Sequence, residues 1–124
     1  MTSFRLRAVV LDCDDARALS TFYSQMFGWT ITEDEGGWVV IRNPDGGTGL
    51  SFAQEDGYVR PTWPSDADHQ QMMLHLDVLV DDLAAATDRA VGLGATLAEF
   101  QPQDEVRVML DPAGHPFCLF VPGG

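Results

Sequence analysis

The segments NPDGGTGLSF (residues 43–52) and DPAGHPFCLF (residues 111–120) share one pattern. Each starts with Asn or Asp followed by proline, continues through a glycine, and ends in a mainly apolar stretch. A proline-glycine turn before a short apolar run predicts a hairpin whose second strand is the apolar run. The occurrence of one pattern at two distant places indicates an internal repeat.

The first copy extends from this hairpin toward the N-terminus. Residues 5–13 are rich in apolar and β-branched types, which favours a strand. Residues 15–28 repeat apolar side chains every three or four positions, with Asp15 where an N-cap belongs and Gly28 where a helix ends. The apolar runs that follow predict three short strands, so the order of the first copy is βαβββ.

The second copy has the same order. A strand is predicted over residues 72–80, followed by a helix that starts after Asp82 and stops at Gly94, and then by three strands. The fold class is therefore α+β, and its two tandem βαβββ modules cover residues 4–54 and 72–122. Residues 55–71 carry prolines, a glycine and many polar residues, which is typical of a linker. We expect one domain over residues 1–124.

Alternation along the first strand of each module separates two sheet faces. In the second module, His75 and Asp77 lie opposite the apolar residues that should contact the helix, and Ala8 and Asp12 have the same place in the first module. With both helices outside, the modules would form one curved mixed sheet around a cleft, which is the expected place for a ligand.

Charge narrows the choice of partners. The chain has 124 residues, with 19 acidic against 7 basic side chains and a net charge of -12. This field repels nucleic acid and anionic membranes and would suit a cationic ligand. There are two cysteines, expected to be reduced, and no apolar segment long enough for a signal peptide or a membrane span, so we expect a cytoplasmic protein.

Three segments in order, DARALSTFYSQMFG (15–28), HLDVLVDDL (75–83) and DPAGHPF (111–117), resemble the vicinal oxygen chelate superfamily of glyoxalases, bleomycin-resistance proteins and ring-cleaving dioxygenases. The chain is most similar to the short glyoxalase-like proteins common in actinobacteria. The resemblance implies paired βαβββ modules around a cleft, a homodimer, and, in metal-dependent members, four metal ligands. Each module then supplies one ligand from its first strand and one from its last.

Transferred to this chain, those four positions are Ala8, Leu50, His75 and Cys118, with Leu50 subject to a one-residue slip of the glycine-rich turn. Alanine and leucine have no lone pair to donate, and two ligands alone bind a divalent metal weakly. We therefore expect no metal and no cofactor. His75 has two other roles open to it besides hydrogen bonding in the cleft: a structural bond to Asp77, or metal ligation.

The residues expected to bind a ligand are His75, Asp77, Cys118, Phe120, Ala8, Asp12, Leu50, Trp38 and Trp63. The aromatic ones are candidates for stacking on a flat ligand or for core packing, and Trp63, between two prolines, is a candidate lid. The leading hypothesis is a metal-free protein that binds, and thereby sequesters, a small drug or metabolite. The alternative is a lyase, isomerase or dioxygenase with a non-standard metal site, or with acid–base catalysis by His75 and Asp12 or Asp77.

Overall fold

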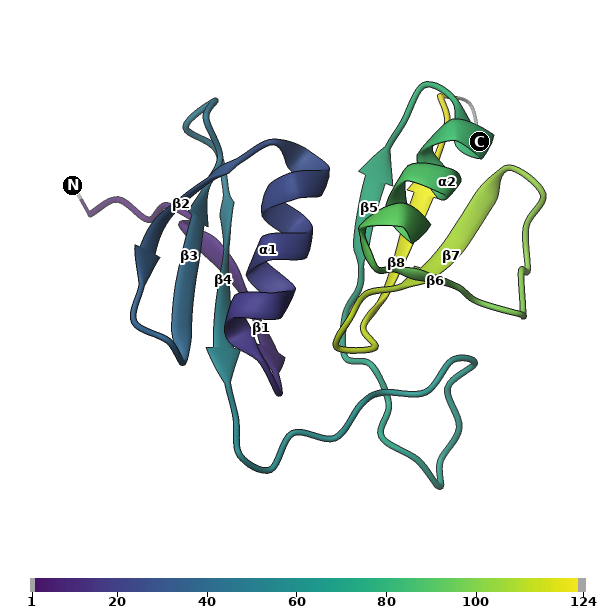
Figure 1. Ribbon diagram of the computed structural model, residues 1–124, viewed down its shortest axis with the longest axis horizontal. Helices are drawn as coiled ribbons and strands as arrows, with labels where there is room; N and C mark the ends of the chain where they lie inside the picture. Colours follow the sequence, from purple (N-terminus) through teal and green to yellow (C-terminus); the bar gives the residue numbers. More distant parts are fainter. Residues whose placement is uncertain (1, 123–124) are drawn as a thin grey trace. The chain divides into compact units, whose positions relative to one another are not determined.

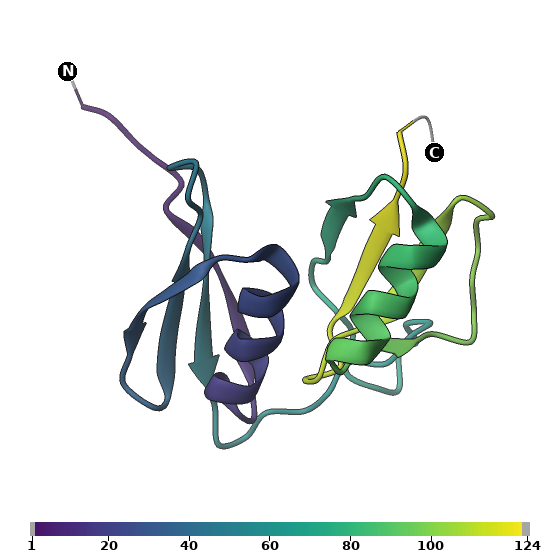
Figure 2. The same cartoon turned by 45° about the horizontal axis from the view of Figure 1, so that its top comes forward.

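The computed structural model describes residues 2–122 and forms two compact units that divide between Tyr58 and Val59. Each unit contains one helix against one face of a four-stranded sheet, as Figures 1 and 2 show. The predicted α+β fold of two repeated βαβββ modules is confirmed. Below, module one is residues 2–58 and module two is residues 59–122. None of the helices in the described residues is both long enough and apolar enough to cross a membrane.

Module one is a mixed sheet in the order β1-β4-β3-β2. Strand β1 pairs in parallel with β4, and the other neighbours pair antiparallel. The first strand of the module, β1, therefore hydrogen-bonds to its last strand, β4. The elements are β1 (Ala8–Cys13), α1 (Ala16–Phe27), β2 (Thr30–Asp34), β3 (Trp38–Arg42) and β4 (Gly49–Gln54).

Helix α1 begins and ends where its caps predict. The Asp15 side chain accepts a hydrogen bond from the backbone N–H of Ala18 at 3.0 Å. Gly28 has φ 72°, in the left-handed region that favours glycine, and its N–H donates to the carbonyl of Ser24. Both caps satisfy backbone groups that a helix leaves without partners at its ends.

The core of module one lies between α1 and the sheet. Phe52, fully buried on β4, stacks on Tyr23 of α1 with ring centroids 5.9 Å apart. The rings of Phe22 and Tyr23 are nearly perpendicular, with centroids 4.9 Å apart, so aromatic rings fill the centre of this layer. The opposite face of the sheet has no helix of this module on it (Figure 2) and is called the open face below.

Leu50 lies on the helix side of the sheet, and its expected place on the open face is wrong. It is 5% exposed and pairs in register with Val9 and Ile41. The turn between β3 and β4 is one residue longer than its counterpart before β8, which shifts the strand by one position. Because neighbouring strand residues face opposite sides, a shift of one moves Ser51 to the open face and Leu50 into the core.

Module two repeats the topology, with the sheet order β5-β8-β7-β6 and β5 parallel to β8. Its elements are β5 (Leu76–Leu79), α2 (Leu83–Leu93), β6 (Thr96–Leu97), β7 (Val106–Leu110) and β8 (Pro116–Phe120). Strand β6 is shorter than the TLAEF run (residues 96–100) that predicts it, and beside it the Gln101 side chain bonds to backbone groups of both Ala98 and Val108. The Ala98 N–H still donates to the Val108 carbonyl, but the N–H of Val108 donates to the Gln101 side chain in place of a strand neighbour.

Residues 59–71, expected to be part of a linker, pack on module two. Arg60 donates to the carbonyl of Pro112 at 2.7 Å, and the Trp63 indole N–H donates to the carbonyl of Phe100 at 3.1 Å. The rings of Trp63 and Phe100 have centroids 6.2 Å apart. Trp63 is therefore anchored to the segment after β6.

Candidate functional site

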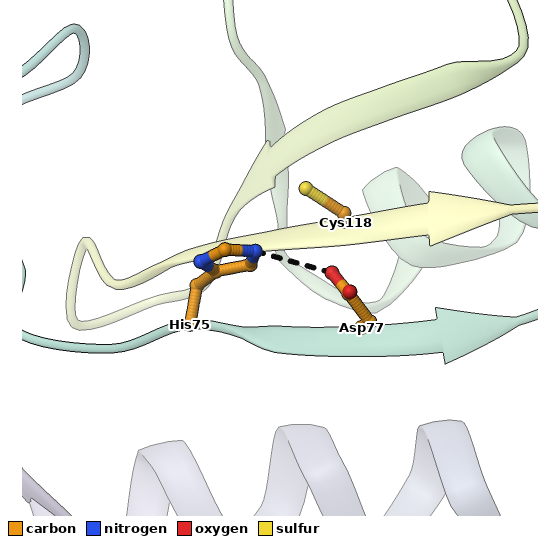
Figure 3. Close-up of side chains that lie close together, drawn as sticks. All are labelled: His75, Asp77 and Cys118. Atoms are coloured by element: carbon orange, nitrogen blue, oxygen red, sulfur yellow. Dashed lines mark ion pairs between the residues drawn. The ribbon is translucent and has the colours of Figure 1, made fainter.

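Three side chains with ligand-type atoms meet on the open face of module two, which is the face of its sheet that has no helix of this module on it. Asp77 on β5 and Cys118 on β8 are direct partners across the parallel ladder. His75 precedes Asp77 by two residues, and Figure 3 shows its ring on the same side as the other two side chains. His75 Nε2 lies 3.2 Å from Asp77 Oδ1, and one donor atom from each of the three residues lies within 4.8 Å of the others.

The cluster lies in a hollow of about 290 Å³. Phe120 and Val106 give the hollow apolar walls, and Gln103 adds an amide. The side chains of His75 and Asp77 are 41% and 61% exposed, so a molecule from solvent can reach them. A few polar groups among apolar walls is the composition typical of a small-molecule site.

The Cys118 thiol is poorly disposed to ionise. Its partial burial raises its pKa, and the negative charge of Asp77 raises the pKa further. The thiolate is the reactive form of cysteine, so the free protein holds Cys118 as a neutral, weakly nucleophilic thiol at neutral pH. This agrees with a wall residue and gives no support to a nucleophilic role.

Alkylation of Cys118 by iodoacetamide, with EDTA present, should be slow at neutral pH and should accelerate at a higher pH than for an ordinary thiol. Asp77→Asn removes the smaller of the two causes that raise the pKa, so alkylation at pH 8 should be faster in this variant. Labelling is followed by intact-protein mass spectrometry, with Cys118→Ser to verify that the fully buried Cys13 does not react. A slower rate in Asp77→Asn would contradict the assigned electrostatic effect.

The donor set fits a zinc-like ion better than the sequence indicated. An imidazole nitrogen, a carboxylate oxygen and a thiolate sulfur are all zinc ligands, and three protein ligands plus one open position are usual for catalytic zinc. Sequence reasoning counted only His75 and Cys118 and missed Asp77. The signal was available, because Asp77 has the same parity as His75 along the strand. Within residues 2–122 no other group of three such side chains comes together.

The equivalent positions of module one cannot complete that set. Val10 and Ser51 pair across the parallel ladder as Asp77 and Cys118 do, and Ala8 has the place of His75. A methyl and an isopropyl group bind no metal, and a hydroxyl is a weak ligand. Because these three positions offer no strong ligand, a metal at His75, Asp77 and Cys118 would take its protein ligands from module two.

The predicted site residues thus divide into five groups. His75, Asp77, Cys118 and Phe120 come together in module two, and Ala8 and Trp38 line a second hollow on the open face of module one. Asp12 is exposed on the open face of the same module. Trp63 is bound to Phe100, and Leu50 is in the core.

A family model described as a glyoxalase-like domain matches residues 8–120. The resemblance to the vicinal oxygen chelate superfamily is thereby confirmed. No curated protein matches the chain.

Solved structures agree on the fold. A glyoxalase/bleomycin resistance protein/dioxygenase family enzyme from Burkholderia phytofirmans PsJN is 20% identical with a TM-score of 0.70, over 95% of this chain and 98% of that chain. An antibiotic-binding protein from Streptomyces sp. CB03234 is 18% identical with a TM-score of 0.62, over 99% of both chains. A lactoylglutathione lyase from Agrobacterium tumefaciens is 18% identical with a TM-score of 0.61, over 98% and 96%.

Proposed function

Since this chain belongs to the glyoxalase-like domain family, we propose that it binds a small organic molecule on the open faces of its sheets, without needing a metal. The observation that carries the proposal is the hollow in which His75, Asp77 and Cys118 converge between apolar walls. Such a site orients a ligand by a few hydrogen bonds and buries its apolar part. Of the four ligand positions that the family resemblance implies, two in each module, only His75 and Cys118 carry strong ligand atoms, which supports binding without a metal.

Sequestration of a drug or metabolite is the form of binding that this site suits. The Cys118 thiol is held neutral, which favours a passive wall over covalent chemistry. The similarity in fold to an antibiotic-binding protein from Streptomyces supports the same idea. A homodimer belongs to the proposal as the family resemblance implies it, and exposed apolar side chains such as Phe4 and Leu79 offer surface for it.

One observation favours a second candidate, a metal-dependent enzyme. His75, Asp77 and Cys118 would hold a zinc-like ion, and such an ion supplies Lewis acidity toward a bound carbonyl. The neighbouring His75 and Asp77 could also pass a proton between them, because Nε2 and Oδ1 are 3.2 Å apart. The similarity in fold to a lactoylglutathione lyase supports this candidate to the same degree.

One experiment separates the two candidates. A library of planar aromatic fragments is screened by ligand-observed NMR, first with EDTA and then with added zinc. We expect fragments to bind with EDTA present, and His75→Ala to weaken them about tenfold, the effect of losing one hydrogen bond to the ligand. His69→Ala is the matched control, because His69 forms a similar pair with Asp66 at 2.8 Å and lies outside the hollow.

Binding that appears only with zinc, and disappears in Asp77→Asn, would replace the metal-free proposal by the metal-dependent one. Absence of binding in both conditions would contradict both. Equal weakening by His75→Ala and His69→Ala would show that the hollow of module two is not where the fragments bind.

A further inference from the structure

A second hollow, of about 480 Å³, lies on the open face of module one. Trp38, Val40 and Arg42 occupy alternate positions of β3 and so share this face. Ser51 of β4 and Arg7, just before β1, also line the hollow. Its composition differs from that of module two, where the lining carries an aspartate and a histidine.

The hollow has an excess of positive charge in an acidic protein. The whole chain has 7 basic against 19 acidic side chains, but the lining has two arginines against one acidic residue, Glu33. A charged ligand responds to the nearest charges most strongly, because salt screens those beyond about 10 Å. The local excess, and not the net charge of -12, therefore sets the preference of this hollow.

The guanidinium groups of Arg7 and Arg42 have no hydrogen bond or ion pair within residues 2–122. Other arginines do have partners: Arg17 binds Asp34 at 3.0 Å, Arg60 binds the carbonyl of Pro112, and Arg107 binds the carbonyl of Asp104. A guanidinium carries five N–H donors in a planar fork that matches a carboxylate or phosphate. Arg42 is thus available to an anion from solvent.

Trp38 supplies the apolar end of the same hollow. It is half-buried, and it is four residues from Arg42 along β3, which places the two Cα atoms about 13 Å apart at ~3.3 Å per residue. Val40 lies between them on the same face. A flat apolar body can therefore lie over Val40 against the indole while an anionic group at its far end reaches Arg42.

We propose that module one selects planar organic anions, with an aromatic body against Trp38 and Val40 and a carboxylate or phosphate at Arg42 and Arg7. This inference rests on the proposed binding of a small molecule and names its chemical class. It reverses the expectation of a cationic ligand, which followed from the net charge of the whole chain.

The test uses three probes of one shape: biphenyl-4-carboxylate, biphenyl-4-ylmethanol and biphenyl-4-ylmethylammonium. Affinities are measured by isothermal titration calorimetry at about 0.1 M salt, where charges beyond about 10 Å are screened, with EDTA present. We expect the carboxylate to bind at least about tenfold more tightly than the alcohol, as for a hydrogen bond between charged groups, and the ammonium to bind most weakly. Among the three probes, added salt should weaken the binding of the carboxylate only.

Three variants test which residues cause the preference for the carboxylate probe. Arg42→Gln should remove most of the advantage of the carboxylate over the alcohol, with Arg7 retaining a part of it, whereas Trp38→Ala should weaken the binding of all three probes. Arg89→Gln, which makes the same change in net charge on α2, should alter nothing. Arg42 is exposed, so its replacement should leave the fold intact, which the unchanged affinity of the alcohol for Arg42→Gln verifies.

Two results would overturn the inference alone: equal affinity for the carboxylate and the ammonium, or a carboxylate preference that is undiminished in Arg42→Gln. Either would leave small-molecule binding intact. If none of the three probes binds and the fragment screen is also empty, the proposed function fails together with the inference.

Discussion

Phe52→Ala should lower the free energy of unfolding by about 3–5 kcal/mol, the usual cost of deleting a buried phenyl ring. Phe52 is fully buried on β4 and stacks on Tyr23, so the deletion leaves a cavity between α1 and the sheet. A small domain is stable by roughly 5–15 kcal/mol, so such a loss brings module one close to unfolding. Urea denaturation followed by circular dichroism measures it.

Phe4→Ala is the matched control, because Phe4 is 92% exposed in the same module. It should change the unfolding free energy by less than ~0.5 kcal/mol. A loss below about 1 kcal/mol for Phe52→Ala would contradict the core described for module one. The β1–β4 pair would then need another source of stability, since Phe52 is the largest side chain on β4.

The second large effect is expected for Asp111→Ala, which should lower the free energy of unfolding by about 2–4 kcal/mol. The Asp111 carboxylate is 2% exposed, and its Oδ1 accepts hydrogen bonds from the backbone N–H groups of Ala113 and His115 at 2.9 and 3.0 Å. Each hydrogen bond to a charged group contributes about 1.5–3 kcal/mol, and its loss leaves a donor without its partner. Urea denaturation again gives the magnitude.

Asp111→Asn is the matched variant, because module one uses Asn43 at the equivalent place, where its Oδ1 accepts from the N–H of Asp45 at 3.0 Å. An amide oxygen can accept the same two bonds, so the loss should be less than half of that for Asp111→Ala. The turn leads directly into β8, so Asp111→Ala should also speed alkylation of Cys118. Equal losses in both variants would show that charge matters here more than the acceptor.

The order of helices and strands was predictable because local chemistry determines it. Asp15, Gly28, Asp82 and Gly94 cap two helices whose apolar spacing is regular, and the repeat supports each assignment by a second instance. Strand β6 was overestimated, since Gln101 makes bonds to Ala98 and Val108 that no pattern of apolar residues reveals.

Sequence alternation along a strand predicted which sheet face a site residue lies on. It did not predict the placements that depend on strand register or on contacts between distant segments. Alternation put His75 and Asp77 on one face, but their proximity to Cys118 depends on which strands pair. Leu50 was misplaced by one residue, because turn length cannot be counted across a glycine-rich segment of unknown geometry. Trp63 was expected as a lid, and only the structure shows its bond to Phe100.

Parallel pairing of the first and last strands also has a consequence during synthesis. All strands of module one have been synthesised when the chain reaches Gln54, and translation of residues 55–120 takes a further ~3–13 s at about 5–20 residues per second. Small mixed α/β domains fold faster than that. By the time β8 exists, β4 is already paired with β1 on one side and β3 on the other. The order of synthesis therefore protects two copies of one pattern from exchanging strands.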